Sequence, residues 1–429
     1  MASLRGVSDI GGSAIAAIFT TGESSFRNAK LRDAGYVAYK IFADIVGKGS
    51  LFLLTLVAAR RLSPRAFGLV ALGSTVGWLL SIASDFGMQM HLARAVARTP
   101  DRAAPLLRHW LRLRLATSAA SLVVVALALS VWNAASPFAR PLLLFAVLYA
   151  CNGLVEFLNY FYRGLSRTDV ESSITLWHKI ATLVVAGAAL AWRPDITVLA
   201  VAMLAPAAAA FVWSLRYATR LAATGAVASR SRQPEPDPAV FARDVFPIGL
   251  GILLSALYFR VDVLLVEWWA GTEAVARYNA VFRLVEALRL FPAAVLAVVL
   301  PALCRADDLG PLIRVSAIVT VAATGASAIL WAAAAPVVRL AYGEPYDSAV
   351  PAFRILALSL PLLSLNFALT HQLVAWNRQR AYAAICALAL VVNVALNARL
   401  IPAFSIDGAA WATFGTELFL TLGCVVALR

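Results

Sequence analysis

The feature that most restricts the fold of this chain is a series of apolar stretches, each about 20 residues long, that recur from residue 37 to the end. A helix of this length crosses the roughly 30 Å of hydrocarbon in a bilayer. With 61% hydrophobic and only 14% charged residues among 429, the chain has more apolar surface than a water-soluble core can bury. We therefore expect an integral membrane protein that spans the bilayer many times.

About twelve spans are expected from these stretches. They cover residues 37–59, 66–84, 115–133, 141–162, 171–191, 196–215, 246–269, 279–303, 313–335, 350–372, 380–401 and 408–428. The stretches lack the period-two alternation of barrel strands and are rich in Leu, Ala and Val, which favours helices. The predicted fold class is an all-α polytopic membrane protein.

The basic residues lie mainly between the apolar stretches, so the net charge of +14 indicates membrane topology and not a nucleic-acid surface. With the N-terminus in the cytoplasm, alternate connections place roughly 22 of the 37 Lys and Arg residues inside and roughly 9 outside. Both termini are then cytoplasmic. The connections richest in positive charge, which face the cytoplasm, contain Arg94, Arg98, Arg102, Arg108, Arg112 and Arg114, and Arg216, Arg220, Arg230, Arg232 and Arg243. Arg60, Arg61 and Arg65 fall outside, against this trend.

A polar, proline-rich segment, Ala222–Pro238, divides the chain into two halves. We expect a cytoplasmic N-terminal tail (1–35), an N-terminal six-helix bundle (36–221), a cytoplasmic linker (222–240) and a C-terminal six-helix bundle (241–429). Each half opens with a helix, a short glycine-containing turn region and a second helix, with the turn regions at Leu62–Gly68 and Ala270–Tyr278. Two such halves around a central cavity are a common plan of transporters.

Charged side chains inside the first span point to a polar interior, because each is unfavourable in lipid by about 2.5–3.5 kcal/mol. Lys40, Asp44 and Lys48 follow at a spacing of four and share one helix face. Asp44 can neutralise only one of the two lysines, which leaves one positive charge to line a cavity. The alternative is an ion-pair ladder that only fixes helix packing.

Two further groups of charges lie in the second half. Arg283, Glu286 and Arg289 in the eighth span are spaced by three and also carry one net positive charge, which suits an anionic group such as a diphosphate. Alternatively, Arg283 and Glu286 pair locally while Arg289 reaches toward the membrane surface. Arg260 and Asp262 lie on nearly opposite faces of the seventh span, so one of them needs a partner on another helix.

Signals of catalysis are weak in this sequence. Gly47–Ser50 is too short for a phosphate-binding loop and lies in a span. The four histidines are scattered singly, so we expect no metal site. We therefore expect neither an enzyme nor a bound cofactor.

Several degenerate motifs occur in an order that resembles the polysaccharide flippases of the multidrug, oligosaccharidyl-lipid and polysaccharide exporter superfamily. They are Ala58–Gly68, Ser84–Met88, Tyr162–Arg167, Arg260–Asp262, Ala276–Ala280, Leu300–Pro301, Ala341–Tyr346, Asn393–Asn397 and Asp407–Ala412. About twelve spans also fit this branch better than the lipid II flippases, which typically have fourteen.

The resemblance implies a bacterial inner-membrane protein that flips undecaprenyl-diphosphate-linked oligosaccharides for O-antigen, capsule or exopolysaccharide assembly. Rocking of the halves would expose a cationic cavity to each side in turn, driven by an ion gradient of H+ or Na+. A polysaccharide polymerase and a chain-length regulator are the expected protein partners. An ion-coupled drug or metabolite exporter of the same fold and a membrane glycosyltransferase or polymerase are the competing functions.

Overall fold

The computed structural model describes residues 38–133, 139–225, 245–289, 310–376 and 378–428, together with the isolated positions Gly35 and Val295. The predicted N-terminal tail and most of the predicted linker lie outside the described residues. The described residues form helices and no strands, so the all-α prediction is confirmed.

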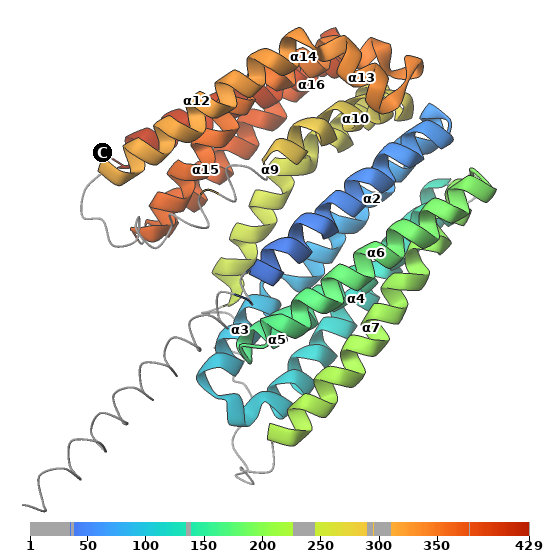
Figure 1. Cartoon of the computed structure of the whole chain (residues 1–429), viewed down its shortest axis with the longest axis vertical. Coiled ribbons are helices and arrows are strands. Elements are labelled where there is room, and N and C mark those ends of the chain that lie inside the picture. Colours follow the sequence, from blue (N-terminus) through green and yellow to red (C-terminus); the bar gives the residue numbers. More distant parts are fainter. Residues whose placement is uncertain are drawn as a thin grey trace, which may run out of the picture.

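The first half of the chain forms one group of helices, seen in blue and green in Figure 1. It begins with Ala38–Arg61, called here the first helix. The helices that follow are α2 (Pro64–Asp85), α3 (Met88–Arg98), α4 (Ala103–Asn133), α5 (Ala139–Gly164), α6 (Thr168–Trp192) and α7 (Ile196–Gly225), with a 3-10 turn, η1 (Pro100–Arg102), before α4.

The second half forms another group, seen in yellow to red in Figure 1. Its elements are α9 (Phe246–Ala270), α10 (Thr272–Leu288), α12 (Gly310–Ala332), α13 (Ala334–Tyr342), the 3-10 helix η4 (Glu344–Ala349), α14 (Val350–Leu358), α15 (Leu360–Ala375) and α16 (Gln379–Leu428). Helix α16 contains non-helical Ser405, with φ 52° and ψ −129°, and therefore holds two successive spans.

Within the described residues, ten helices are long and apolar enough to cross a membrane, and one of these is the double span of α16. The eighth expected span begins as α10, and its remainder lies outside the described residues. The bounds of most other helices agree with the expected spans to within a few residues, but α7 continues ten residues beyond the expected end at residue 215. The short helices α3 and α13 were not expected, and α4 begins about a dozen residues earlier than the apolar stretch that predicted it.

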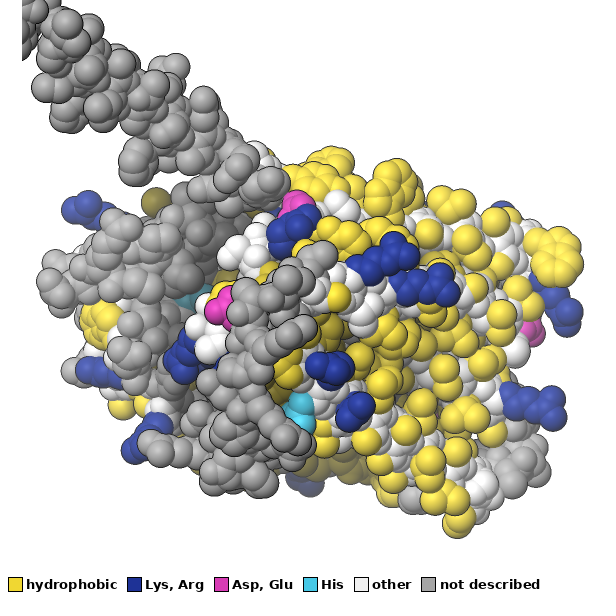
Figure 2. Space-filling model, turned by 90° about the horizontal axis from the view of Figure 1, so that it is seen from below, with side chains coloured by type: hydrophobic (Ala, Val, Ile, Leu, Met, Phe, Trp, Pro, Cys, Tyr) yellow, Lys and Arg dark blue, Asp and Glu magenta, His cyan; other side chains and the backbone are white. Residues whose placement is uncertain are grey.

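The outer surface of the described helices is the apolar surface that a lipid-embedded protein requires. Val131, Trp192 and Val426 are among many large hydrophobic side chains left exposed. Figure 2 shows hydrophobic side chains over most of the described surface seen from below, with Lys and Arg side chains among them. Multiple spans and this surface make the chain a multi-pass membrane protein.

The two groups of helices share one hydrophobic core at one end of the molecule, called here the outer end because the topology prediction places it outside. Leu62 and Phe67 from the first half and Tyr278, Tyr342 and Tyr346 from the second belong to this core. In Figure 1 the groups meet near α13 and diverge toward the opposite, inner end. At the inner end each group has a core largely of its own.

Direct contacts join the halves at the outer end. The Arg60 guanidinium donates to the carbonyl oxygen of Ala341 at 2.8 Å and to that of Leu340, so it satisfies carbonyls at the end of α13. The Phe67 and Tyr346 rings meet edge to face with centroids 6.2 Å apart. These contacts give Arg60 a structural role where the two halves meet.

Glycine permits the closest approach between the halves. A Cβ atom on Gly68 would lie 2.0 Å from the carbonyl oxygen of Thr272, so the backbones of α2 and α10 touch there. At the inner end Gly249 is similarly pressed against Phe86, whose ring lies 5.5 Å from that of Phe246. Helix α2 is therefore contacted by the second half at both of its ends.

Candidate functional site

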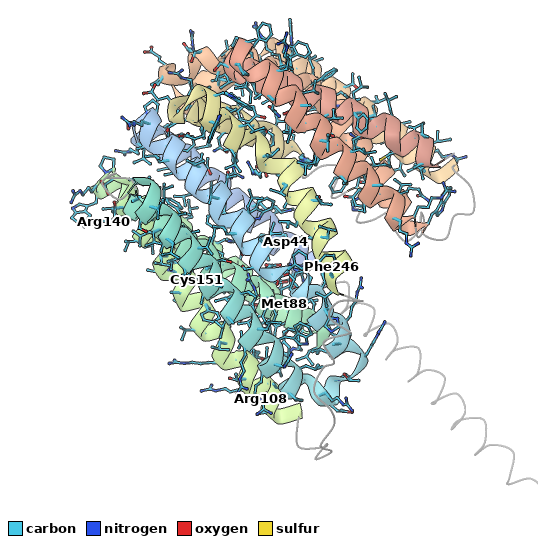
Figure 3. The ribbon with its side chains drawn as sticks, turned by 180° about the vertical axis from the view of Figure 1, so that it is seen from behind. Asp44, Met88, Arg108, Arg140, Cys151 and Phe246 are labelled. Atoms are coloured by element: carbon cyan, nitrogen blue, oxygen red, sulfur yellow. The ribbon has the colours of Figure 1, made fainter. Side chains whose placement is uncertain are left out.

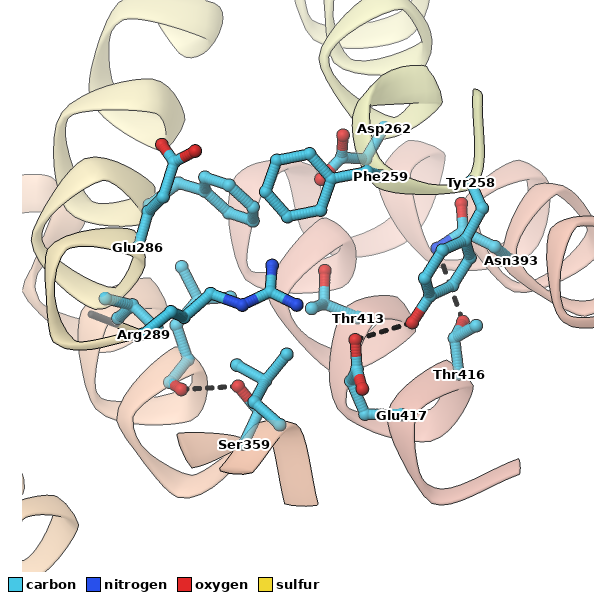
Figure 4. Close-up of a pocket in the computed structure, with 14 residues that line it drawn as sticks. Tyr258, Phe259, Asp262, Glu286, Arg289, Ser359, Asn393, Thr413, Thr416 and Glu417 are labelled. Atoms are coloured by element: carbon cyan, nitrogen blue, oxygen red, sulfur yellow. Dashed lines mark hydrogen bonds between the residues drawn. The ribbon is translucent and has the colours of Figure 1, made fainter. Parts of the chain in front are cut away.

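A small pocket lined largely by polar residues lies inside the second group of helices. It is enclosed by α9, α10, α14, α15 and α16. Its lining residues are Tyr258, Phe259, Asp262, Phe282, Val285, Glu286, Arg289, Leu356, Ser359, Leu363, Asn393, Thr413, Thr416 and Glu417. Figure 4 shows the polar side chains converging from these helices. A concentration of this kind in a membrane protein indicates a functional site.

Glu417 is the buried carboxylate on one side of the pocket. Its Oε1 accepts a hydrogen bond from the Tyr258 hydroxyl at 2.5 Å, and its Oε2 accepts one from the Asn366 amide at 2.7 Å. No Lys or Arg of the described residues forms an ion pair with it. Glu417 is thus solvated by neutral donors, an arrangement that can accept a proton or a cation.

Asp262 is a second buried carboxylate held by neutral donors. Its Oδ2 accepts from the Tyr278 hydroxyl at 2.5 Å, and its Oδ1 accepts from the backbone amide of Val263 at 2.8 Å. The Tyr278 hydroxyl also lies 3.1 Å from that of Thr413 on α16. Asp262 therefore links α9 to α10 and α16, and it forms no ion pair with another described residue.

Glu286 joins two arginines on the side of the pocket formed by α10. Its carboxylate lies 3.1 Å from Arg260 on α9 and 2.7 Å from Arg283 on its own helix. Arg260 is buried, whereas Arg283 is about 29% exposed. The local Arg283–Glu286 pair predicted as an alternative is present, but Arg260 shares the same carboxylate. The partner that Arg260 needed on another helix is therefore Glu286.

Arg289 follows α10 and extends into the pocket toward Thr413 (Figure 4). Its guanidinium lies over the Phe259 ring at 4.8 Å, and it forms no ion pair within the described part of the chain. Phe259 also contacts Trp78 of α2, with ring centroids 6.5 Å apart. One aromatic ring therefore separates this guanidinium from the contact between the halves.

The charges around the pocket balance. Arg260, Arg283 and Arg289 face three acidic residues: Asp262, Glu286 and Glu417. The single net positive charge predicted for the eighth span is thus compensated by the Glu417 carboxylate of α16, because Arg260 and Asp262 of α9 cancel each other. The guanidinium groups do not outnumber the carboxylates around the pocket. Any preference of this site for an anion must therefore come from the placement of individual guanidinium groups.

A second cluster of charges ties the first helix to α5 and α6. Glu171, only 2% exposed, accepts from Lys40 at 2.7 Å and from Arg163 at 2.6 Å. Lys40 lies 3.6 Å from Asp44, the partner expected from helical spacing, and Arg163 lies 3.4 Å from Glu156. The cluster is therefore centred on a carboxylate from a different helix.

Lys48, the other cation of this face of the first helix, does not take part in this cluster. Its side chain is exposed, and it has no ion pair among the residues that the structure describes. Its neighbour Gly47 faces the Lys179 side chain, with 3.4 Å between its ideal Cβ position and Lys179 Cγ. The structure thus separates Lys40 and Asp44, which are paired, from Lys48.

The predicted site residues therefore fall into two places. Arg260, Asp262, Arg283, Glu286 and Arg289 come together around the pocket, while Lys40, Asp44 and Lys48 lie in the first helix. Pocket residues not singled out from the sequence include Tyr258, Thr413 and Thr416, which carry no charge and look like ordinary helix residues. From the sequence, Glu417 is a further charged candidate within a span that is equally compatible with a structural pair, and Asn393 belongs to the motif Asn393–Asn397.

Comparison with known proteins gives one family. The model of a family described as polysaccharide biosynthesis protein matches residues 36–306. No curated protein sequence matches the chain significantly.

Solved structures resemble the fold over most of the chain. The lipid II flippase MurJ in an inward closed conformation has 12% sequence identity and a TM-score of 0.69, covering 92% of this chain and 87% of MurJ. A multidrug resistance MATE family transporter in an outward-facing conformation has 14% identity and a TM-score of 0.63, covering 92% and 94%. A transporter of the MOP superfamily from Pyrococcus furiosus has 15% identity and a TM-score of 0.59, covering 91% and 93%.

At these identities the structural likeness shows the fold, which this chain shares with the flippase and the transporters. The family match spans well over half of the chain and agrees with the resemblance found in its motifs. This chain is a membrane protein of the flippase and transporter fold and belongs to the polysaccharide biosynthesis protein family.

Proposed function

We propose that the protein flips undecaprenyl-diphosphate-linked oligosaccharide repeat units across the bacterial inner membrane for assembly of O-antigen, capsule or exopolysaccharide. The family match supports this role, and MurJ, a lipid II flippase, has the same fold. The termini are cytoplasmic in this proposal, as the distribution of basic residues predicts.

The proposal rests on Lys48 and Arg289, two of the cations within the described spans that have no ion-pair partner among the described residues, together with partly exposed Arg283. Unpaired cations within spans are unfavourable unless they face water or an anionic ligand. A diphosphate matches the donors of a guanidinium, and each such charge-assisted contact is worth about 1.5–3 kcal/mol. We propose that these three residues hold the diphosphate while the prenyl tail remains in lipid.

The experiment is complementation of a strain that lacks the protein. Lys48→Ala, Arg283→Ala and Arg289→Ala should each lower surface polysaccharide by about tenfold or more if a phosphate contact is lost. Arg193→Ala, an exposed arginine between α6 and α7, is the control and should complement fully. Unchanged surface polysaccharide in all three test variants would contradict the proposal.

Movement requires the halves to separate at the outer end, where they now share a core. We propose that an ion gradient drives this change and that Glu417 and Asp262 take up the coupling H+ or Na+. This proposal is supported by the burial of both carboxylates, neither of which has a cationic partner among the described residues. Glu417→Gln should therefore retain binding of the lipid-linked oligosaccharide but lose the response of transport to an imposed gradient. An equal gradient response in this variant would remove Glu417 from the coupling step.

The balanced charge of the pocket favours one competing function, an ion-coupled exporter of drugs or metabolites with the same fold. A neutral or cationic substrate would need no excess of positive charge. Resistance to cationic compounds that depends on the protein, with normal surface polysaccharide in its absence, would support this alternative over the flippase.

A further inference from the structure

Exposed arginines gather at the inner end of the first group of helices, far from the pocket in the second group. Arg108 and Arg112 lie on the exposed face of α4, and Arg216 and Arg220 lie on that of α7. Figure 3 shows Arg108 at this end and Arg140 of α5 at the opposite end of the same group of helices. We call the surface formed by Arg108, Arg112, Arg216 and Arg220 the inner collar.

The two helices that carry the inner collar pack against each other and share a core. Leu107 and Trp110 of α4 and Ala218 and Ala222 of α7 belong to this core. The arginines occupy helical positions between these buried ones, so they point away from the core on both helices. They therefore form one basic surface across two adjoining helices.

The inner collar lies at the boundary between apolar and polar surface. On α4, exposed Leu113 and Leu115 directly follow Arg112 along the helix. On α7, exposed Val212 and Trp213 lie within one turn of Arg216. Trp213 stacks on Tyr217 with ring centroids 5.9 Å apart, and such aromatic residues favour the headgroup level of a bilayer. The arginines thus lie where lipid phosphates lie.

None of the four guanidinium groups has an ion pair or hydrogen bond with another residue that the structure describes. Nearby Arg167, by contrast, is held by Asp169 at 3.0 Å, and this bond raises the pKa of the Arg167 guanidinium. The collar guanidinium groups therefore remain available to an external anion.

An adjoining surface helix extends this polar boundary. Helix α3 buries Met88, Leu92 and Val96 against the same core, while Arg94 and Arg98 are exposed. An amphipathic helix with a basic outer face is typical of an element that lies in the membrane interface. Membrane topology alone requires positive charge on this side, but not its concentration at the edge of the apolar surface.

We propose that the inner collar is a binding site for anionic phospholipid headgroups, with a phospholipid that carries two phosphates bridging the arginines of α4 and α7. Guanidinium groups bind phosphate oxygens in a bidentate manner, and basic residues near the interface favour anionic lipids. The acyl chains would lie against the exposed apolar residues of the same helices. This surface is separate from the proposed substrate site, so the inference holds whatever the protein transports.

The test is lipid binding to the purified full-length protein, measured by native mass spectrometry during titration with cardiolipin or phosphatidylcholine. Wild-type protein should bind cardiolipin in preference to phosphatidylcholine. R108Q/R112Q and R216Q/R220Q should each weaken cardiolipin binding by about fivefold for each arginine lost, or roughly 25-fold for a pair. R140Q/R193Q removes two exposed arginines from the opposite end and should leave cardiolipin binding unchanged.

Two further measurements distinguish a bidentate lipid site from nonspecific attraction of anions to a basic surface. R108K/R112K keeps the charge but loses the bidentate geometry, so its affinity for cardiolipin should fall between those of wild-type protein and R108Q/R112Q. Soluble pyrophosphate at the concentration of cardiolipin should not displace the lipid. Equal binding of both lipids by wild-type protein, an equal loss in R140Q/R193Q, or displacement by pyrophosphate would overturn the proposal.

Discussion

Glu171 shows at the scale of a single residue how this protein accommodates charge within the membrane. Its carboxylate is almost fully buried and bonds to two cations, Lys40 of the first helix and Arg163 of α5. Buried ion pairs add little stability compared with apolar packing, but loss of one partner leaves uncompensated charge. Glu171 therefore specifies how three helices fit together, since each cation needs it in place.

Replacing this carboxylate tests that role. Glu171→Gln should lower the free energy of unfolding by about 3–5 kcal/mol, because Lys40 and Arg163 lose their shared acceptor. The matched control is Glu273→Gln, which removes a 59% exposed carboxylate paired with Arg277 and should change stability by no more than about 1 kcal/mol. Thermal unfolding in detergent measures both. Equal effects of the two substitutions would show that Glu171 has no special structural role.

Helical spacing predicted part of these contacts. It placed Lys40 and Asp44 on one face, and they lie 3.6 Å apart, but the closer partner of Lys40 is 131 residues away in sequence. Likewise, spacing suggested the Arg283–Glu286 pair but not the sharing of Glu286 with Arg260. Partners within one helix follow from periodicity, whereas partners on other helices depend on tertiary packing that a single sequence does not encode locally.

At the scale of helices, the closed outer end depends on the small size of glycine. Gly68→Ala should push α2 away from α10, because the added Cβ would lie 2.0 Å from the Thr272 carbonyl oxygen. We expect longer distances between spin labels at exposed positions Trp192 and Leu340, measured by double electron–electron resonance. Gly187→Ala, where a Cβ meets nothing within 4 Å, should leave the distances unchanged. Identical distance distributions in the two variants would show that the contact between Gly68 and Thr272 does not hold the outer end closed.

The break in α16 gives another prediction at this scale. Ser405 has φ 52° and ψ −129°, a conformation that favours glycine. Ser405→Gly should therefore raise the free energy of unfolding by about 1 kcal/mol. Ser130→Gly, in the continuous helix α4, should lower it by about 0.5–1 kcal/mol. Chemical denaturation followed by circular dichroism distinguishes the two, and a loss of stability in Ser405→Gly would show that this backbone conformation is not strained.

Most elements were predictable because a membrane span needs a long apolar stretch. The exceptions have clear causes. Helices α3 and α13 have 11 and 9 residues, too short for a window set by bilayer thickness. The first residues of α4 are an arginine-rich segment, which hydropathy assigns to a connection between spans. The position of the pocket could not be predicted either. Its lining residues Tyr258, Thr413 and Thr416 are uncharged and resemble ordinary helix residues in the sequence.

At the scale of the whole molecule, two groups of helices meet at the outer end, and each contributes a cation that has no ion-pair partner among the described residues. The first group contributes Lys48 and the second contributes Arg289. Opening the outer end while both cations hold one diphosphate would carry the headgroup across the membrane, provided that the halves move relative to each other.

Translocation in proteoliposomes tests this central claim most directly. Purified protein is reconstituted with a fluorescent undecaprenyl-diphosphate-linked oligosaccharide, and its transfer between leaflets is measured with a membrane-impermeant quencher. We predict transfer that depends on the wild-type protein and falls by at least about tenfold when Lys48→Ala and Arg289→Ala are combined. Transfer no faster than in protein-free vesicles, or an undiminished rate in the double variant, would contradict the claim.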